Sequence, residues 1–220
     1  MKILVKGGAG FIGSNFVKPL LRDTDHDATI IDSLTYSGTK KNLDGTLDDS
    51  RLRFVEGDIR NEDLVNELAS ETDAIVNFAA ESHVDRSIEG AKPFVSTNVQ
   101  GTQALLDAAV EHDHDRFLQI STDEVYGQVL EGKFIEGDPL NPRNPYAATK
   151  ASADMLARSY HITHDLPVLI TRSSNNYGPN QHREKLIPKF ITRAARGEQL
   201  PLYGDGQQIR EWTFVEDNCR

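Results

Sequence analysis

The sequence predicts an α/β fold in which helices cover both faces of a doubly wound parallel sheet. Short apolar runs alternate with helix-length segments over residues 1–171, which is the pattern of repeated strand–helix units. The runs consist of consecutive Val, Ile and Leu rather than alternating apolar and polar residues, which indicates strands buried on both faces. A glycine-rich segment, Gly7–Gly13, joins the first apolar run to the first helical segment. That arrangement is typical of Rossmann-type nucleotide-binding sheets.

Each expected element of the sheet is a short apolar run that is followed by a helical or turn-forming segment. The strands are expected at Lys2–Val5, Thr29–Ile31, Arg53–Glu56, Ala74–Asn77, Phe117–Ile120 and Pro167–Thr171. The helices are expected near Phe11–Arg22, Glu62–Ser70, Pro93–Glu111 and Pro145–His164. Asn144 is a good N-cap for the last helix, and proline suits its first position.

The pattern changes after Thr171. Residues 172–184 are rich in Asn, Ser, Gly and Pro and are expected to form a loop. A helix is expected from Leu186 to Ala195, and an extended stretch around Leu200–Tyr203. A turn at Gly204–Gly206 then precedes residues 208–214. This region is predicted to begin a smaller lobe over the ends of the strands.

Composition limits the classes of protein that need to be considered. The chain has 220 residues, of which 38% are hydrophobic, and no apolar run approaches the length that spans a membrane. The N-terminus shows no signal-peptide pattern, and the single cysteine, Cys219, leaves no partner for an intrachain disulfide. A cytoplasmic protein is therefore expected, with no membrane association.

The charge of the chain is strongly negative. A formal net charge of -10 argues against a nucleic-acid partner, because phosphate backbones are bound by clustered Lys and Arg. Aspartates gather at residues 23–27, 48–49 and 113–115. They favour a solvated acidic surface, and a further hypothesis is adaptation to high salt. The sequence predicts no metal site.

The glycine segment predicts a dinucleotide site. Glycines allow the tight turn, bring backbone N–H groups close to a pyrophosphate, and let the helix pack closely on the strand. Asp32 ends the second expected strand, where its carboxylate could accept hydrogen bonds from the adenosine ribose and repel a 2′-phosphate. NAD is therefore favoured over NADP. The alternative is a tight turn without a ligand, and Lys6 is interpreted as a strand-end residue that reaches solvent.

Tyr146 and Lys150 are four residues apart and therefore neighbours on one helix face. A tyrosine pKa near 10 is too high for a base at neutral pH, but the Lys150 ammonium and a positive nicotinamide ring would lower it. This pair suits removal of a hydroxyl proton coupled to hydride transfer. A surface helix on which the two residues coincide is the alternative interpretation.

Two adjacent acids, Asp123 and Glu124, follow the strand expected at Phe117–Ile120. Open α/β sheets bind ligands at the carboxyl ends of their strands, so these acids are expected at the catalytic edge. One carboxylate as base and one neutral carboxylic acid as proton donor could divide an elimination between them. The alternative role of such residues is turn formation.

Taken together, these motifs resemble the extended short-chain dehydrogenase/reductases and, more narrowly, the dTDP-glucose 4,6-dehydratases. The motifs span the whole chain and comprise the glycine loop, Asp58-Ile59, the segment Ala79–Ser87, Ser121–Gly127, Tyr146–Lys150 and Ser174–Pro179. The adjacent acids are the most discriminating element, because related 4-epimerases share the glycine loop and the Tyr/Lys pair but usually have no acid pair.

The resemblance implies a role for each matching residue. The implied catalytic residues are Thr122, Asp123, Glu124, Tyr146 and Lys150. The implied contacts to NAD are Gly7, Gly10, Phe11, Ile12, Gly13, Asp32, Ser33, Leu34, Thr35, Asp58, Ile59, Ala79, Ala80, Glu81, Ser82, Thr97, Tyr146, Lys150 and Asn176. The implied contacts to a nucleotide-sugar substrate are His83, Thr122, Asn175, Lys185, Leu186, Pro201, Leu202, Tyr203 and Arg210. Residues 1–171 would form an NAD-binding domain with the catalytic residues, and residues 172–220 part of a substrate-binding lobe.

The implied reaction converts dTDP-glucose, or a related NDP-glucose, to its 4-keto-6-deoxy form. Tyr146 would remove the C4 hydroxyl proton while hydride passes from C4 to NAD. The resulting ketone acidifies the C5 proton, which Glu124 would abstract while Asp123 protonates the departing C6 hydroxyl. Hydride would then return to C6. The resemblance also implies a homodimer through the long helices near Pro93–Glu111 and Pro145–His164.

The chain departs from the family pattern at two points. The family normally continues well beyond the segment Val215–Asp217, so the chain is interpreted as a fragment or as a shortened protein. Lys6 also stands where threonine is usual before the glycines. Two alternative functions therefore stay open: a UDP-sugar 4-epimerase or other NAD-dependent sugar-nucleotide modifier, and a non-catalytic NAD-binding module.

Overall fold

A computed structural model describes residues 1–202 and 204–220. Its main feature is a six-stranded sheet in the order β3-β2-β1-β4-β5-β6, and every neighbouring pair in the sheet is parallel. The strands are β1 (Lys2–Lys6), β2 (Asp27–Asp32), β3 (Leu52–Glu56), β4 (Ala74–Asn77), β5 (Arg116–Thr122) and β6 (Val168–Ser173). The predicted doubly wound parallel sheet is confirmed.

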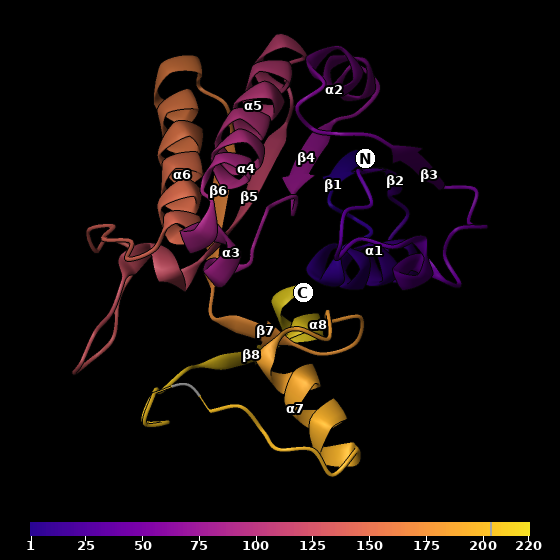
Figure 1. Cartoon of the computed structure of the whole chain (residues 1–220). Coiled ribbons are helices and arrows are strands. Elements are labelled where there is room, and N and C mark those ends of the chain that lie inside the picture. Colours follow the sequence, from indigo (N-terminus) through magenta and orange to yellow (C-terminus); the bar gives the residue numbers. More distant parts are fainter. Residues whose placement is uncertain (203) are drawn as a thin grey trace.

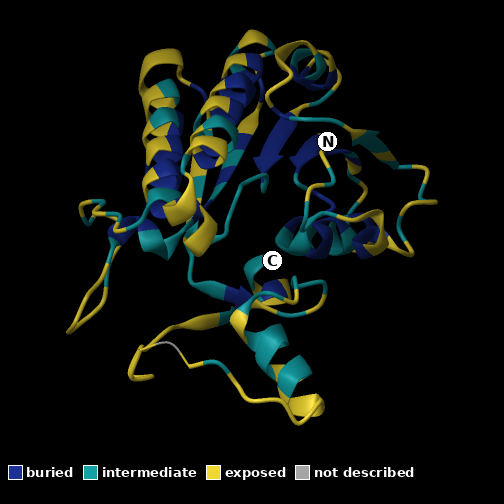
Figure 2. Ribbon diagram, in the orientation of Figure 1, coloured by how far each residue is buried: buried dark blue, intermediate teal, exposed yellow. Residues whose placement is uncertain are grey.

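Helices cover both faces of the sheet. The helix α1 (Phe11–Asp23) packs on one face through Val17 and Leu21. The helices α2 (Glu62–Ala69), α5 (Gly101–Glu111) and α6 (Pro145–His164) pack on the other face. In Figure 1, α5 and α6 lie side by side, and Figure 2 shows the buried strands between the helical layers. Because both faces are covered, the strands are apolar runs, as their sequences indicate.

Several short helices had no counterpart in the sequence prediction. They are η1 (Lys40–Leu43), α3 (Val84–Glu89), η3 (Asp123–Tyr126) and α8 (Val215–Asn218). The expected helix at Pro93–Glu111 is not one regular helix: α4 (Lys92–Phe94) leads into a π-helical stretch, η2 (Val95–Gln100), and then into α5. Side-chain contacts explain this break, because Asn98 of η2 is held by the loop that carries Glu81.

The prediction of a loop over residues 172–184 was partly wrong. The strand β6 continues to Ser173, and Asn175–Tyr177 form β7, which pairs in parallel with β8 (Trp212–Phe214). These strands, with α7 (Leu186–Ala195), lie beyond the carboxyl ends of the sheet strands (Figure 1). No residue of α7 is buried, and Figure 2 shows this lobe as the more exposed part of the molecule. Tyr203, which the sequence places in an extended stretch, lies outside the described residues.

Candidate active site

An open cavity of about 400 Å³ lies where the sheet strands end and the small lobe begins. Parallel strands present their carboxyl ends at one edge, and the loops that follow β1, β2, β4 and β5 all reach this cavity. Residues of β7, β8 and the start of α7 line its other side. The cavity therefore lies between the two parts of the chain.

The glycine turn approaches its neighbours too closely to carry side chains. Gly7 has a φ of 72°, and a Cβ there would lie 2.8 Å from the backbone nitrogen of Ala79. A Cβ on Gly13 would lie 2.3 Å from the carbonyl oxygen of Gly7. The turn thus brings the N-terminus of α1 against the end of β1. Backbone N–H groups at a helix N-terminus suit an anion, so this cradle fits a pyrophosphate.

Asp32 is 8% exposed and holds the loop that faces the glycine turn. Its Oδ2 accepts a hydrogen bond from the Ala9 amide at 2.9 Å, and its Oδ1 accepts one from the Leu34 amide at 2.9 Å. Burial raises the pKa of this carboxyl, while the two backbone hydrogen bonds lower it. Asp32 lines the cavity at the end of β2, where a ribose would meet it.

Lys6 does not reach solvent, so that interpretation is wrong. The residue is fully buried, its Nζ has no hydrogen-bond partner among the described residues, and it is not a cavity-lining residue. Lys6 lies on the same sheet face as Leu4, and its strand partner Asn77 is also fully buried. Burial lowers the pKa of Lys6 to about 7. An exposed lysine would keep a value near 10.

The loop that follows β4 is fixed by Asn98 of η2. The Oδ1 atom of Asn98 accepts a hydrogen bond from the Glu81 amide at 2.9 Å, and its Nδ2 donates to the Glu81 carbonyl at 3.0 Å. The same amide donates to Oγ1 of Thr149 on α6 at 2.9 Å. Asn98 thereby connects the cavity loop at residues 79–82 to two helices, and its neighbour Thr97 lines the cavity.

Tyr146 and Lys150 both line the cavity from the first turns of α6. Asn144 caps this helix, because its side chain accepts a hydrogen bond from the Ala147 amide at 2.8 Å. The free amide of Tyr146 donates to Oγ of Ser87 at 3.2 Å. Two side chains therefore satisfy the start of the helix and hold Tyr146 at the cavity.

In this structure Lys150 does not lower the pKa of Tyr146, which differs from the expectation from the sequence. Burial raises the pKa of Tyr146, and the charges of Glu124 and Asp123 raise it further, while a hydrogen bond with Thr122 lowers it. Lys150 instead donates from Nζ to the Ile120 carbonyl at 2.5 Å. Burial lowers the pKa of Lys150 to about 8, although the charge of Asp154 raises it.

The acid pair lies on η3, the single turn that follows β5. Oγ1 of Thr122 donates to Oδ1 of Asp123 at 3.2 Å and accepts from the Glu124 amide at 3.3 Å. Nδ2 of Asn144 donates to Oε2 of Glu124 at 3.0 Å, which places this carboxylate beside the start of α6. Glu124 lines the cavity. Burial raises the pKa of Asp123 above its ordinary value, and the neighbouring Glu124 charge adds to that rise.

A cluster of charged residues lies on one side of the cavity, where Glu184 and Lys185 line it. Nζ of Lys185 donates to the Ser82 carbonyl at 3.1 Å. Arg86 pairs with Glu184 at 3.0 Å, and its guanidinium lies 4.2 Å from the centre of the Tyr36 ring. His83 caps α3 by accepting from the Arg86 amide, which is a structural role.

Most of the site residues expected from the sequence line this one cavity. They are Gly7, Gly10, Phe11, Ile12, Gly13, Asp32, Ser33, Thr35, Asp58, Ile59, Ala79, Ala80, Glu81, Ser82, Thr97, Thr122, Glu124, Tyr146, Lys150, Asn175, Asn176, Lys185 and Leu186. The expected residues that do not line it are Leu34, His83, Asp123, Pro201, Leu202 and Arg210. Tyr203, also expected to contact substrate, lies outside the described residues.

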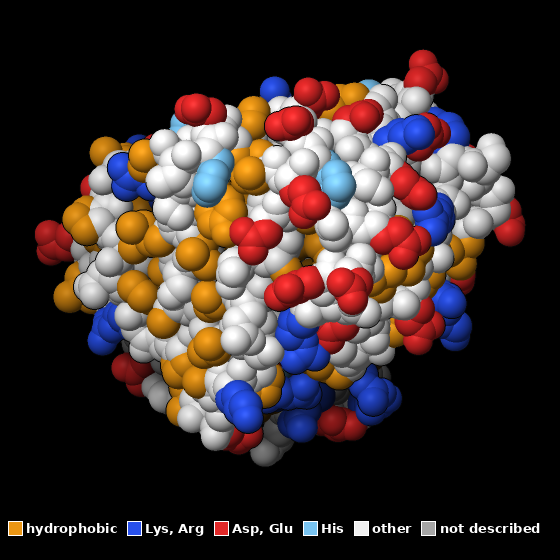
Figure 3. Space-filling view, turned by 90° about the horizontal axis from the view of Figure 1, so that it is seen from above, with side chains coloured by type: hydrophobic (Ala, Val, Ile, Leu, Met, Phe, Trp, Pro, Cys, Tyr) orange, Lys and Arg blue, Asp and Glu red, His pale blue; other side chains and the backbone are white. Residues whose placement is uncertain are grey.

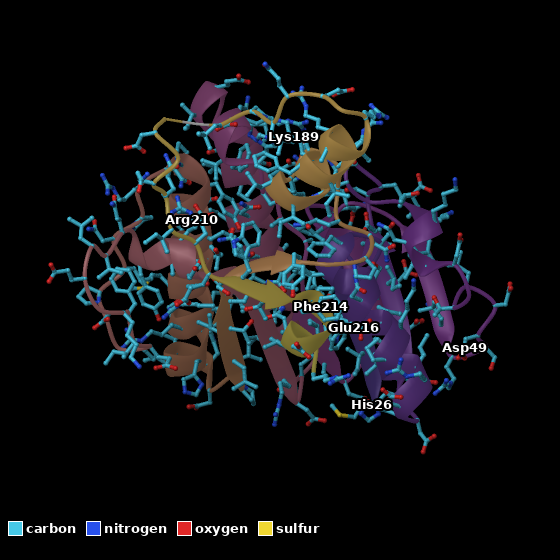
Figure 4. All side chains as sticks on the ribbon, turned by 90° about the horizontal axis from the view of Figure 1, so that it is seen from below. His26, Asp49, Lys189, Arg210, Phe214 and Glu216 are labelled. Atoms are coloured by element: carbon cyan, nitrogen blue, oxygen red, sulfur yellow. The ribbon has the colours of Figure 1, made fainter. Side chains whose placement is uncertain are left out.

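Asp123 and Arg210 do not line the cavity, for different reasons. Asp123 is adjacent to the cavity, because its charge acts on the buried phenol of Tyr146. Arg210 is exposed and donates to its own neighbour, the Ile209 carbonyl, at 2.8 Å. Figure 4 shows Arg210 on the segment that leads into β8, away from Phe214 and Glu216. In this structure, Arg210 therefore contributes nothing to the cavity wall.

Some residues that line the cavity were not expected from the sequence. They include Tyr36, Arg60, Phe78, His182, Glu184 and Trp212. Tyr36 and Arg60 directly follow expected site residues, so loop continuity was the available signal. Trp212 reaches the cavity only because β8 pairs with β7, a contact between distant segments.

Residues 1–202 and 204–220 contain neither a membrane-spanning helix nor a metal-binding cluster. No helix there is long and apolar enough to cross a membrane. Within the same ranges, no group of three or more His, Cys, Asp or Glu side chains is arranged to hold a metal ion.

Known proteins have similar sequences. The profile of the family described as GDP-mannose 4,6 dehydratase matches residues 4–220. A low-salt glycan biosynthesis protein, Agl12 of Haloferax volcanii, is 68% identical over 219 residues, which are 100% of this chain and 71% of that protein. A dTDP-glucose 4,6-dehydratase of an Actinoplanes species is 51% identical, and the match covers 100% of this chain and 71% of the relative.

A solved structure gives the same result. The dTDP-glucose 4,6-dehydratase of Streptomyces venezuelae, crystallised with NAD and dTDP bound, superposes with a TM-score of 0.97 at 54% identity. The match covers 100% of this chain and 70% of that one. By profile, sequence and structure, the chain belongs to the GDP-mannose 4,6 dehydratase family, within the extended short-chain dehydrogenase/reductases that its motifs resemble.

Proposed function

We propose that this chain carries the active site of an NAD-dependent nucleotide-sugar 4,6-dehydratase, with dTDP-glucose or a related NDP-glucose as substrate. The observation that carries the proposal is the position of Glu124, which lines the same cavity as Tyr146 and Lys150 and accepts a hydrogen bond from the cap of their helix. An epimerase needs the Tyr/Lys pair alone. A dehydratase also needs an acid and a base next to the same sugar.

The cavity residues support NAD as the cofactor. The glycine turn fits a pyrophosphate, and Asp32 suits a ribose without a 2′-phosphate. We propose the NAD contacts that the sequence predicts, namely residues 7, 10–13, 32–35, 58–59, 79–82, 97, 146, 150 and 176. Leu34 would act through its backbone amide, which donates to Asp32. When bound, NAD supplies the acceptor and donor of hydride.

The proposed first step belongs to Tyr146. Its hydroxyl takes the proton from the sugar C4 hydroxyl, and a hydrogen bond with Thr122 lowers the pKa of the phenol. The pKa of Tyr146 is high in the structure because the phenol is buried near two acids. A cationic nicotinamide and a reoriented Lys150 ammonium would act in the opposite direction.

The elimination divides between the two acids. Asp123 has a pKa raised by burial, so it retains a proton more readily than an exposed carboxyl and can donate it to the departing C6 hydroxyl. Glu124 is the proposed base for the C5 proton. The Asn144 amide orients its carboxylate and leaves the second oxygen for the substrate.

The proposed substrate contacts differ in whether the residue lines the cavity. Asn175, Lys185 and Leu186 line the cavity, and the ammonium of Lys185 suits a diphosphate. His83, Pro201, Leu202 and Arg210 do not line it in this structure, and their proposed roles require movement or neighbouring segments. We retain residues 1–171 as the proposed NAD-binding domain and residues 172–220 as part of the substrate lobe.

A cytoplasmic homodimer is proposed as the working form. Met155 is 54% exposed and Ile162 is 66% exposed, and both lie on the outer side of α6. Figure 3 shows hydrophobic side chains gathered on the side of the molecule where Figure 1 places α6. A second copy packed on α5 and α6 would remove this apolar surface from water.

Product analysis tests the proposed function. NAD-loaded protein is incubated with dTDP-glucose, with UDP-glucose in parallel, and the products are identified by mass and NMR. Loss of water to give a 4-keto-6-deoxy sugar is expected, and Tyr146→Phe should give none. A C4 epimer without dehydration would instead support the epimerase, and tight NAD binding without turnover by the full-length protein would support a non-catalytic module.

A further inference from the structure

A buried carboxylate lies on α6 directly beyond the Tyr/Lys pair. Asp154 is four residues after Lys150, so Tyr146, Lys150 and Asp154 follow one face of the helix. Asp154 is 1% exposed and does not line the cavity. A charge buried this deeply needs a partner, because its loss of hydration is otherwise uncompensated.

The partner is Arg172 on β6. Its Nε donates to Oδ2 of Asp154 at 2.9 Å, and the two side chains are 20% and 1% exposed. The other arm of the guanidinium donates to the Tyr126 hydroxyl at 2.7 Å. Arginine can make both contacts because its planar fork presents several N–H groups in fixed directions.

Tyr126 is the last residue of η3, the turn that carries Asp123 and Glu124. It is 7% exposed, its ring stacks on Phe134 with 5.3 Å between centroids, and it packs with Ala151 of α6. The chain of contacts Asp154–Arg172–Tyr126 therefore joins the helix of the Tyr/Lys pair to the turn of the acid pair. We call these three residues the brace.

The brace has a counterpart at the cavity end of the same two elements. There, Asn144 joins the start of α6 to Glu124 through its side-chain amide. With both connections, α6 and η3 are tied at two places, one beside the cavity and one behind it. A turn tied only at the cavity end could pivot and carry its carboxylates away from the sugar.

We propose that Arg172 is a positioning residue, which fixes η3 against α6 so that the acid pair and the Tyr/Lys pair face one hexose at the same time. The proposal rests on the proposed function, since it assigns both pairs to one reaction. The opposing influences on the pKa values of Lys150 and Asp154 support the proposal. Burial lowers the pKa of Lys150, which the Asp154 charge opposes, and burial raises the pKa of Asp154, which the Arg172 hydrogen bond opposes.

Two variants release the η3 end of the brace. Tyr126→Phe removes only the hydroxyl and keeps the Asp154–Arg172 ion pair and the stacked ring. Arg172→Lys keeps the positive charge but cannot fork between Asp154 and Tyr126. The NAD-loaded protein is mixed with dTDP-glucose, and reduced nicotinamide and dehydrated sugar are followed together in a single turnover.

The expected result is a change in the balance between the two half-reactions. Because the acid pair is displaced more than the Tyr/Lys pair, elimination should slow by roughly tenfold to a hundredfold while KM stays within about twofold. Reduced nicotinamide should then accumulate in both variants. If both variants accumulate no more reduced nicotinamide than the wild type and keep its kcat, the proposal is overturned.

A second measurement does not depend on catalysis. The Gly127 amide donates to the Glu124 carbonyl at 3.1 Å and reports opening of η3. Its hydrogen exchange should be about tenfold faster in Tyr126→Phe, because a hydrogen bond to a charged group is lost. If wild-type protein makes no dehydrated sugar, the proposed function fails, and this exchange rate alone decides whether the brace holds η3.

Matched controls separate positioning from general weakening. Tyr160→Phe removes a hydroxyl that also lies on α6 and donates to Asp107 of α5, away from the cavity. Arg51→Lys removes a comparable forked contact, to Asp49 and to the carbonyls of Leu21 and Thr24. Both controls should keep the wild-type balance between the two half-reactions and the wild-type hydrogen-exchange rate of the Gly127 amide. If they change these readouts as much as the brace variants do, the effect is unspecific and the proposal is wrong.

Discussion

Glu124 is a residue whose proposed chemistry can be separated from its structural contact. Its Oε2 accepts the Asn144 amide at 3.0 Å, and a glutamine at this position would still offer an oxygen to that donor. The amide cannot act as a carboxylate base. One substitution therefore removes the base and keeps the geometry of η3 and α6.

We predict that Glu124→Gln still oxidises the substrate but slows elimination by about 10²- to 10⁴-fold, the usual contribution of a general base. Reduced nicotinamide should build up, and C5 should exchange little of its proton with deuterated solvent. The exposed Glu111→Gln at the end of α5 is the control. Undiminished dehydration by Glu124→Gln would refute the assignment.

Lys6 shows how far a residue can depart from its expected environment. Burial in the sheet leaves its amine without a hydrogen bond to any residue in the described part of the chain and lowers its pKa from 10.5 to about 7. The folded value is below the unfolded value, so the unfolded chain binds more protons between about pH 7 and about pH 10. Stability should therefore rise with pH across this window and stay at its lower level below pH 7.

We predict that Lys6→Met stabilises the protein at pH 7 by up to about 5 kcal/mol, the equivalent of the pKa difference. Between about pH 7 and about pH 9.5, the rise of stability with pH should be smaller by about 3 kcal/mol, because each pH unit between the two pKa values corresponds to about 1.4 kcal/mol. Urea unfolding at about pH 7 and about pH 9.5 measures both effects. Lys2→Met is the control, because Lys2 is the exposed residue of the same strand. Equal pH dependence in wild type and Lys6→Met would contradict the prediction.

At the scale of elements, the start of α6 combines folding and function. Asn144 caps the helix through Oδ1 and orients Glu124 through Nδ2. The cap signal at Asn144-Pro145 is local, which is why α6 begins where the sequence predicts, and its end at His164 also matches the prediction. The second contact depends on η3, a turn that has no such signal.

We predict that Asn144→Ala lowers the free energy of unfolding by about 1 kcal/mol through the lost cap. It should also lower kcat for dehydration, because Glu124 loses its orienting donor. Asn61→Ala is a matched control, since Asn61 caps α2 by accepting from the Leu64 amide at 3.2 Å and does not itself line the cavity. A similar loss of stability without loss of activity is expected there. Equal kcat in both variants would show that the Glu124 contact is dispensable.

Other elements were not predictable from local sequence. The pairing of Asn175 with Trp212 in β7 and β8 joins segments far apart in the chain, and neither segment is a long apolar run. The π-helical stretch η2 is held by contacts of Asn98 to Glu81 and Thr149, which no periodicity indicates. By contrast, the six sheet strands were found because each contains a short apolar run, and the runs in β1 and β4 are buried.

At the scale of the whole molecule, the site could be predicted where motifs follow strand ends in a parallel sheet. Residues such as Asp32, Glu124 and Tyr146 converge because the sheet topology brings their strands or helices to one edge. The positions of the residues in the small lobe were predicted less well from the sequence. Arg210 donates to the carbonyl of its neighbour Ile209, and a side chain on an irregular segment has no periodicity that indicates its direction.

The acidic surface makes stability depend on salt. A net charge of -10 repels itself across the folded molecule, and Figure 3 shows Asp and Glu side chains spread over one face. We predict that the urea midpoint rises between about 0.1 M and about 1 M KCl, as the screening length falls from about 10 Å to about 3 Å. Sucrose at matched osmolality is the control. The same midpoint at both salt concentrations would remove the hypothesis of adaptation to high salt.

The last residues of the chain lie against the first helix. Sγ of Cys219, which follows α8, donates to the carbonyl of Ile12 in α1 at 3.7 Å, and burial raises the pKa of this thiol to about 12. Cys219 is the sole cysteine of the sequence, so a thiol reagent has one target. Its labelling rate would follow any separation of α8 from α1, and the native chain thus carries its own probe for coupling between the two parts that enclose the cavity.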